Sequence, residues 1–160
     1  MPPNIRPITR KDKPAIMHIL HNTPEFTSPE VTIAEELIDC YLDDPVGSGY
    51  YILIAEVGLK VAGYICWGPT PLTEGTWDIY WMAVSREEQS KGTGKALLAA
   101  AEEKIKKSQG RLILIETSAK PEYEKTRQFH FSRGYSLISR IPDFYAPGDD
   151  MLTLQKRLTP

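Results

Sequence analysis

The sequence contains few cysteines and no long hydrophobic run. Two of its 160 residues are cysteine, Cys40 and Cys66, and their wide separation is typical of reduced thiols in a cytosolic protein. The longest apolar run, residues 96–101, is far shorter than the ~20 residues that a membrane-spanning helix needs. The first residues also lack the apolar core of a secretory signal. We therefore expect a cytoplasmic protein with no membrane partner.

An excess of charge of either sign is also absent. The chain has 19 Lys and Arg residues against 21 Asp and Glu residues, a formal net charge of -2, and no basic block. Nucleic-acid-binding proteins usually carry a basic stripe or a strong positive excess, so we expect no nucleic-acid partner. No internal repeat occurs, and the content of 41% hydrophobic and 25% charged residues is ordinary for a globular protein. These values predict a single domain over residues 1–160.

Strand and helix patterns alternate along the chain. Strand patterns occur at residues 5–8, 50–57, 61–67, 76–84, 111–117, 135–141 and 151–157. Helix patterns run from Thr9 to Asn22, from Ser28 to just before Asp43, and over residues 93–108 and 122–133. This order predicts an α+β (mixed α/β) protein in which a mixed sheet is packed between helices.

Some of these elements also predict which residues are buried. One face of the second helix is apolar and consists of Ile33, Leu37, Ile38 and Tyr41. We expect that face to pack against the sheet. The Leu-Ile-Leu-Ile run at residues 112–115 predicts a central strand that is buried on both faces. Residues 141–150 are rich in Pro, Gly and Asp and predict a turn-rich loop between the last two strands.

The segment at residues 83–95 carries the strongest functional signal. It combines the end of a strand, a polar turn, a Gly-Thr-Gly sequence at residues 92–94 and a strong helix. Closely spaced glycines allow backbone N–H groups to approach an anion, and the start of a helix adds partial positive charge. Lys91 and Lys95 add charge that suits phosphate oxygens. By itself the pattern leaves two alternatives, an anion-binding site or a plain helix N-terminus.

Two common phosphate-binding loops do not fit these residues. A P-loop needs a glycine five residues before its Gly-Lys pair and Ser or Thr after it, where this chain has Gln89 and Ala96. The dinucleotide-binding fingerprint needs a small residue three positions after Gly94, where Leu97 stands. An unrelated nucleotide-binding domain, which would bind ATP or NAD tightly, is therefore the weakest interpretation.

Two motifs resemble those of one enzyme family. Residues 89–94, Gln-Ser-Lys-Gly-Thr-Gly, match the Q/R-x-x-G-x-G/A loop of the GCN5-related N-acetyltransferase (GNAT) superfamily. Residues 126–135, Thr-Arg-Gln-Phe-His-Phe-Ser-Arg-Gly-Tyr, resemble its F-Y-x-x-x-G-F segment and follow after one intervening strand, as expected. The resemblance extends from about Ile5 to the final strand. It implies the GNAT fold, a largely antiparallel mixed sheet of about seven strands with helices on both faces and a splay between strands 4 and 5.

The resemblance also implies a binding site for acetyl-coenzyme A. In this family the coenzyme lies between the splayed strands, and the backbone contacts to its pantetheine arm map onto Met82, Ala83 and Val84. A backbone N–H in this stretch would polarise the thioester carbonyl. The loop and lysines implied to hold the pyrophosphate are Gln89, Ser90, Lys91, Gly92, Thr93, Gly94 and Lys95.

Two carboxylates are candidates for the general base. Acetyl transfer requires that the attacking ammonium lose a proton, and a carboxylate near the implied cleft can accept it. Asp78 stands on the fourth strand and Glu116 at the end of the fifth. Strand alternation predicts that Asp78, Tyr80 and Met82 lie on one face. A cap or a solvated rim residue is the alternative for each carboxylate.

The proton donor for the departing thiolate is where the sequence departs from the family. His130 stands where the family often has a Tyr, and an imidazole with a pKa near ~6.5 can protonate a thiolate. Tyr145 and Tyr123 are the alternative donors, and Tyr123 itself stands where an Asn near the coenzyme is common. Because the usual Tyr is missing, a coenzyme A-binding regulatory module without catalysis is an alternative function.

The acceptor is expected to be a primary amine. Asp143, Phe144 and Tyr145, together with Tyr80 on the fourth strand, are candidate substrate contacts, because aromatic rings beside carboxylates suit a cation. We therefore expect an N-acetyltransferase with direct attack by a cationic small molecule, and a protein N-terminus or lysine is the alternative acceptor. His18 and His21 lack an apparent third ligand, so we expect no metal. A homodimer is compatible with the sequence.

Overall fold

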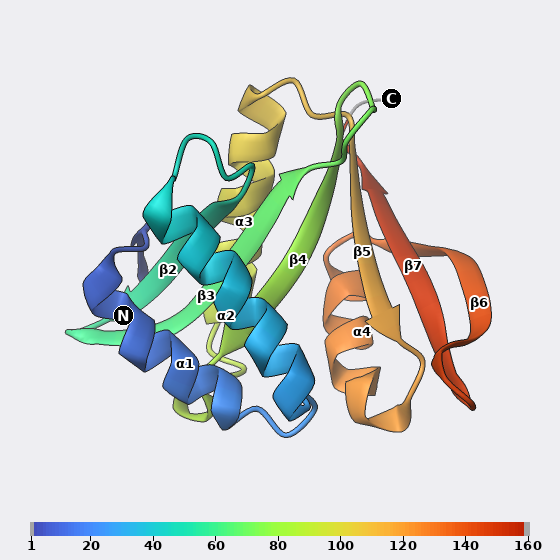
Figure 1. Ribbon diagram of the computed structural model, residues 1–160, viewed down its shortest axis with the longest axis horizontal. Coiled ribbons are helices and arrows are strands. Elements are labelled where there is room, and N and C mark those ends of the chain that lie inside the picture. Colours follow the sequence, from blue (N-terminus) through green and yellow to red (C-terminus); the bar gives the residue numbers. More distant parts are fainter. Residues whose placement is uncertain (1, 159–160) are drawn as a thin grey trace.

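A computed structural model describes residues 2–158 and contains a seven-stranded mixed sheet with helices on both faces (Figure 1). The strands are β1 (Asn4–Pro7), β2 (Tyr51–Val57), β3 (Lys60–Pro69), β4 (Thr76–Val84), β5 (Leu112–Ser118), β6 (Ser136–Ala146) and β7 (Asp149–Arg157). The α-helices of the described residues are α1 (Lys13–His21), α2 (Ser28–Asp43), α3 (Thr93–Lys107) and α4 (Glu124–Ser132). Short 3-10 helices are η1 (Arg10–Asp12), η2 (Arg86–Glu88) and η3 (Pro121–Tyr123). The predicted mixed α/β class is confirmed.

The sheet is antiparallel except at its centre. Its strand order is β1-β2-β3-β4-β5-β7-β6, and β4 and β5 are the parallel pair. These two strands pair from Thr76 opposite Leu112 to Ile79 opposite Ile115, and no pairing follows beyond that point within residues 2–158. Figure 1 shows β4 and β5 diverging towards the lower edge of the view. The predicted splay between the fourth and fifth strands is therefore present.

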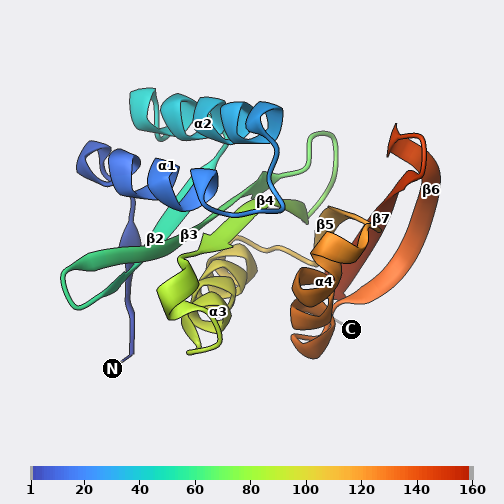
Figure 2. The same cartoon turned by 90° about the horizontal axis from the view of Figure 1, so that it is seen from below.

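Two hydrophobic cores lie on opposite faces of this sheet. Helices α1 and α2 cover one face, whereas α3 and α4 lie on the other (Figure 2). The core beneath α1 and α2 includes Ile16, Leu20, Val31, Ala34, Ile38, Ile52, Ile54, Tyr64 and Ala83. The core beneath α3 includes Leu53, Ile65, Trp67, Trp77, Ile79, Leu97, Leu98, Ile105, Ile113 and Leu154. Burying each large side chain of this kind stabilises the fold by about 1.5–3 kcal/mol, so the two cores hold the layers together.

The buried face of α2 differs from the predicted one. Val31, Ala34 and Ile38 are buried, whereas Ile33 is 48% exposed, so the expectation for Ile33 is wrong. Residues spaced three, four and seven apart share a helix face, and Val31, Ala34 and Ile38 have that spacing. Ile33 lies at the edge of the apolar stripe, and it lines the cleft described below.

Strand β5 is fully buried on one face, not on both. Ile113 and Ile115 are buried in the core beneath α3, but Leu112 and Leu114 are only half-buried. The core beneath α1 and α2 contains no residue of β5 among the described residues. The prediction of burial on both faces is wrong because the α1–α2 layer does not extend over this strand.

The segment at residues 141–150 is a hairpin and not the predicted turn-rich loop. Strand β6 continues to Ala146 and β7 begins at Asp149, which leaves a two-residue turn with Gly148 at a φ of +81°. The register shifts between Ile141 and Ala146, and Asp143 adopts a φ of +55°. The Pro, Gly and Asp residues therefore make an irregular strand end and a tight turn, which suits their conformational preferences.

A bulge in β4 changes the direction of its side chains. Trp81 pairs with Cys66 and Ile79 pairs with Trp67, so Tyr80 is an extra residue on β4. A residue inserted in this way reverses the alternation beyond it. Met82 therefore packs with the core beneath α3, as Ile79 does, and the prediction that it shares a face with Asp78 is wrong.

Candidate active site

A cleft of about 2100 Å³ opens where β4 and β5 separate. Its walls come from the ends of these strands, the start of α3, the helix α4, the segment between α1 and α2, and the β6–β7 hairpin. The predicted site residues that line it are Asp78, Tyr80, Met82, Ala83, Val84, Gln89, Ser90, Gly92, Gly94, Lys95, Glu116, His130 and Tyr145. Most of the residues singled out in the sequence thus meet in one place.

The start of α3 presents backbone N–H groups to this cleft. Gly92 precedes the helix in the left-handed conformation, with a φ of +90°, and no side chain caps the helix. The helical bonding begins with the Ala96 N–H, which donates to the Gly92 carbonyl. The N–H groups of Thr93, Gly94 and Lys95 therefore have no acceptor inside the helix. Such a helix start attracts anions.

The loop before α3 is tied to the end of β4. The Gln89 side-chain amide donates to the Val84 carbonyl at 3.2 Å. Gly94 faces Phe129 of α4. A Cβ atom at residue 94 would lie 3.5 Å from the Phe129 ring, which is an ordinary contact distance. Lys91 does not line the cleft, and its ammonium lies 3.9 Å from Glu88. Thr93 is buried and does not belong to the cleft lining.

The unpaired end of β4 offers two further N–H groups. The Ser85 N–H donates to the Ala62 carbonyl of β3 at 2.7 Å. Because N–H directions alternate along an antiparallel strand, the Ala83 N–H also faces β3. The N–H groups of Met82 and Val84 then face the gap beside β5. These are the positions where a carbonyl oxygen could be polarised.

Asp78 and Tyr80 occupy the β4 side of the cleft. The Thr70 hydroxyl donates a hydrogen bond of 2.6 Å to the Asp78 carboxylate. Tyr80 packs edge-to-face on Tyr50, with ring centroids 5.6 Å apart. Burial, reinforced by the neighbouring Asp78 carboxylate, raises the pKa of Tyr80 to about 12. Its phenol is therefore protonated at neutral pH.

Glu116 and Tyr145 lie on the β5 side. The Glu116 side chain is exposed to the cleft and has no hydrogen-bond partner within residues 2–158. Burial, with the negative charges of Glu116, Asp149 and Glu30, raises the pKa of Tyr145 to about 12. Tyr145 thus stands among carboxylates from β5, β7 and α2, with its phenol protonated.

His130 is almost completely buried, with 4% of its surface exposed. Burial lowers its pKa to about 4, below the ordinary value of 6.5 on which the sequence-based interpretation relied. Its Nδ1 atom has no hydrogen-bond partner among the described residues, and its ring meets the edges of Phe129 and Tyr135. The imidazole is therefore neutral at pH 7.

Two of the predicted substrate contacts lie outside the cleft lining. The Asp143 carboxylate accepts the Gly148 N–H at 2.7 Å and thereby holds the β6–β7 turn. Phe144 is 51% exposed and packs edge-to-face on Tyr145. Within the described residues, Tyr145 and Asp149 are the members of this hairpin that line the cleft.

Comparison with known proteins identifies the family. The acetyltransferase (GNAT) family profile matches residues 13–135. The chain belongs to the GNAT family of acetyltransferases. A comparison with curated proteins found no match.

Solved GNAT structures share the fold of this protein. A GNAT-family protein from Desulfovibrio desulfuricans has 35% sequence identity and a TM-score of 0.90, over 97% of this chain and 98% of that one. The ribosomal-protein-alanine N-acetyltransferase of Brucella melitensis has 21% identity and a TM-score of 0.76, over 97% and 99%. The PaiA N-acetyltransferase of Thermoplasma acidophilum, solved with coenzyme A, has 15% identity and a TM-score of 0.76, over 98% and 99%.

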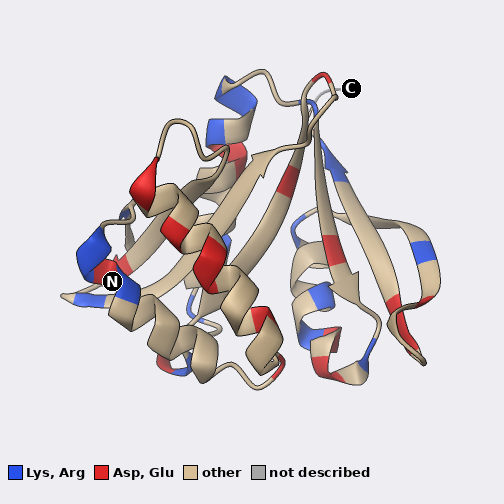
Figure 3. Ribbon diagram, viewed as in Figure 1, with Lys and Arg blue, Asp and Glu red and all other residues tan. Residues whose placement is uncertain are grey.

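Charged residues of both signs line the cleft of this GNAT protein, and Figure 3 shows where the acidic and basic residues lie along its helices and strands. Basic lining residues include Arg86 of η2, Lys95 of α3, Lys125 of α4 and Arg133, which directly follows α4. Acidic lining residues from α2, β4, β5 and β7 include Glu30, Asp78, Glu116 and Asp149. Glu87, next to Arg86, and Lys120, which lies 3.5 Å from Asp149, also line the cleft, so neither sign is confined to one side of it.

Sequence reasoning missed several lining residues of this GNAT protein. Asp149 is buried, accepts the Ser118 hydroxyl at 2.5 Å and lies 3.5 Å from the Lys120 ammonium. Its position in the cleft could have been predicted only from the register in which β6 and β7 pair. Glu30 had a visible local signal, because Thr27 and Glu30 have capping-box spacing, but nothing local showed that it reaches the cleft.

Residues 2–158 contain no cluster of three or more His, Cys, Asp or Glu side chains placed to hold a metal ion. Among the helices of the same part of the chain, none has the length and apolar character needed to span a membrane.

Proposed function

We propose that this protein is an N-acetyltransferase that moves an acetyl group from acetyl-coenzyme A to a primary amine of a cationic small molecule. One observation carries the proposal: a single cleft has an uncapped helix start at one end and carboxylates on both diverging strands at the other. Family membership supports the reaction class. A protein N-terminus or lysine is the alternative acceptor.

The coenzyme end fits a diphosphate. The N–H groups at the start of α3 and the nearby Lys95 and Arg86 would neutralise phosphate oxygens. The N–H groups of Met82 and Val84 would hold the pantetheine arm and polarise the thioester carbonyl as it becomes an oxyanion. Acetyl-coenzyme A supplies the activated acetyl group, and the protein supplies position and charge.

Glu116 is the general base in this proposal. It would take a proton from the ammonium of the acceptor, and the neutral amine nitrogen then bonds to the thioester carbonyl carbon. As the tetrahedral adduct collapses, the carbon–sulfur bond breaks and the nitrogen loses its second proton to solvent, which leaves a neutral amide and a thiolate. Asp78 is less suited to the role, because the Thr70 hydroxyl already binds its carboxylate.

Tyr145 is the proton donor for the thiolate. Its phenol is protonated across the neutral range, since burial and neighbouring carboxylates raise its pKa to about 12. His130 is the alternative, but burial lowers its pKa to about 4, so it would act as a neutral N–H donor to sulfur and not as an imidazolium. Tyr123 is held by other partners, described below.

A cationic acceptor is supported by the chemistry of the opposite wall. Glu30, Asp78, Glu116 and Asp149 are acidic, and Tyr80 and Tyr145 offer aromatic faces for a cation. The related structures do not choose an acceptor, since one acts on a ribosomal protein and another is an aminoglycoside 6′-N-acetyltransferase. Fold alone does not determine the acceptor.

A thiol-release assay with acetyl-coenzyme A tests this function. The amines are spermidine, kanamycin, free lysine, a lysine-containing peptide and a peptide with a free N-terminal alanine. We expect turnover with at least one cationic small amine and none, or much less, with the peptides. Coenzyme A binding without turnover of any amine would support a regulatory module instead, and peptide-selective turnover would support the protein acceptor.

A further inference from the structure

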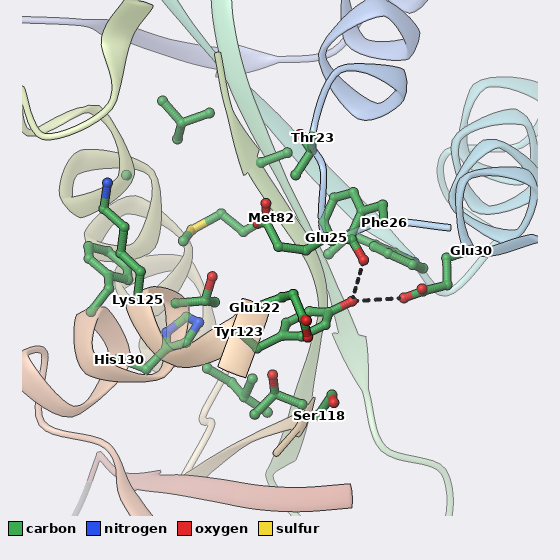
Figure 4. A pocket seen from close by; sticks show the side chains of 18 of the residues that line it. Thr23, Glu25, Phe26, Glu30, Met82, Ser118, Glu122, Tyr123, Lys125 and His130 are labelled. Atoms are coloured by element: carbon green, nitrogen blue, oxygen red, sulfur yellow. Dashed lines mark hydrogen bonds between the residues drawn. The ribbon is translucent and has the colours of Figure 1, made fainter. Parts of the chain in front are cut away.

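The hydroxyl group of Tyr123 links two parts of the chain that are far apart in sequence. It lies 3.0 Å from the Glu25 carbonyl oxygen and 3.2 Å from Oε2 of Glu30 (Figure 4). Burial and the Glu30 carboxylate raise the pKa of Tyr123, so the hydroxyl keeps its proton. With one proton and two acceptors, it donates to either oxygen without moving away from the other.

Glu30 is held from its other side as well. Its Oε1 atom accepts the Thr27 N–H at 3.1 Å and the Thr27 hydroxyl at 3.0 Å. This capping box fixes the start of α2. Both carboxylate oxygens are thus engaged, one within α2 and one by Tyr123, and the side chain has little freedom to leave the bridge.

The segment between α1 and α2 is also pinned to the sheet. The Phe26 ring packs edge-to-face on Trp81 of β4, with centroids 5.3 Å apart and an angle of 89° between the planes. Glu25, Phe26 and Thr27 all line the cleft. Residues 22–27 therefore form one wall of the cleft, fastened to β4 through Phe26 and to η3 through Tyr123.

The position of this bridge separates it from the coenzyme loop. Tyr123 ends η3, which follows β5, whereas Glu25 and Glu30 belong to the α1–α2 layer. That layer covers the face of the sheet opposite to α3, whose start is the anion-binding end of the cleft (Figure 2). The bridge therefore crosses the opening between β4 and β5 on the side away from the phosphate-binding amides.

We propose that Tyr123 is a positioning residue that holds residues 22–27 in place as the wall of the acceptor site. The inference rests on the proposed acetyltransferase function and deepens it, because it names the residue that shapes the acceptor end. Tyr123 acts through Glu25 and Glu30 and takes no part in proton transfer. A fixed wall at this end favours a small amine over a folded protein surface.

The test compares Tyr123→Phe with the unchanged protein by hydrogen–deuterium exchange and by calorimetric titration with coenzyme A. We expect amides of residues 22–30 to exchange at least about fivefold faster, the effect of losing one hydrogen bond. Coenzyme A affinity should stay within about twofold. The KM for the amine that the panel identifies should rise about fivefold, with kcat little changed.

Tyr135→Phe is the matched control, because the Tyr135 hydroxyl donates to the Glu102 carboxylate at 2.7 Å away from the cleft lining. It should leave exchange at residues 22–30 unchanged. In Glu30→Gln the amide oxygen can keep the capping box, and the amide N–H can donate to the Tyr123 oxygen while the Tyr123 hydroxyl donates to the Glu25 carbonyl. This variant should therefore preserve the slow exchange that Glu30→Ala loses.

Unchanged exchange in Tyr123→Phe would overturn the proposal, and so would weakened coenzyme A binding with an unchanged acceptor KM. Absence of turnover by the unchanged protein would refute the proposed function instead. The exchange comparison would still decide whether Tyr123 holds the wall.

Discussion

The Thr70 hydroxyl donates a hydrogen bond of 2.6 Å to the Asp78 carboxylate, whereas the Glu116 carboxylate has no such partner within residues 2–158. A carboxylate that already accepts a hydrogen bond from a neighbour has fewer free lone pairs with which to take up a substrate proton. The two candidate bases therefore differ in environment although both line the same cleft. This difference is the reason why we propose Glu116, and not Asp78, as the group that accepts the proton.

Replacing Glu116 by Gln should lower kcat/KM by about 100-fold and remove the acidic limb of the pH–rate profile. Asp78→Asn is the matched variant and should lower kcat/KM by less than about tenfold. The measurement is steady-state thiol release over a range of pH. A larger loss in Asp78→Asn than in Glu116→Gln would transfer the role to Asp78.

Gly94→Glu should weaken coenzyme A binding by more than about tenfold, because a carboxylate at the helix start repels the diphosphate. Gly94→Ala should bind within about threefold, since the added Cβ meets the Phe129 ring at an ordinary 3.5 Å. Calorimetric titration measures both affinities, and circular dichroism checks the fold. Equal affinities in the two variants would show that the diphosphate lies elsewhere.

His130 should make the protein sensitive to acid. Its folded-state pKa of about 4 lies below the ordinary 6.5, so the unfolded chain binds the proton more readily and stability falls as pH drops through that interval. Between about pH 7.5 and about pH 5 the free energy of unfolding should fall by about 2 kcal/mol through this group. The free energy of unfolding of His130→Phe, measured with urea at both pH values, should fall by about 2 kcal/mol less than that of the unchanged protein. A loss equal to that of the unchanged protein would mean that the imidazole is not buried as a neutral group.

Tyr145→Phe should lower kcat by about 100-fold if the phenol protonates the thiolate, with coenzyme A affinity unchanged. Its raised pKa, about 12, predicts no loss of activity from phenol ionisation near neutral pH. His130→Ala should lower kcat by less than about tenfold. The opposite ranking of the two variants in single-turnover assays would return the donor role to His130.

The sequence was sufficient to predict those features that depend on residues close together in the chain. The apolar spacing placed β4 at residues 76–84 and α3 from residue 93, and the glycines marked the uncapped helix start. Paired motifs at residues 89–94 and 126–135 led to the family that the profile match shows. Each of these signals lies within a short stretch of chain, which is why it could be interpreted without coordinates.

The register in which neighbouring strands pair could not be predicted from local sequence patterns. The Tyr80 bulge redirects Met82, and the β6–β7 register brings Asp149 into the cleft while Asp143 serves the turn. A shift of one residue moves every following side chain to the other face, and cross-strand pairing decides where that shift occurs. Strand alternation therefore misplaced Met82, and the composition of residues 141–150 could not distinguish the role of Asp143 from that of Asp149.

The sequence by itself determined the order of elements, the glycine-rich start of α3 and the family. The tertiary structure alone decided that His130 is buried and neutral and that Tyr123 meets Glu30 across the cleft. Periodicity and capping reflect interactions within a few residues, whereas the pKa of a group and its distant partners depend on what the packed chain places around it. The chemistry of the cleft is therefore set by the fold as much as by its motifs.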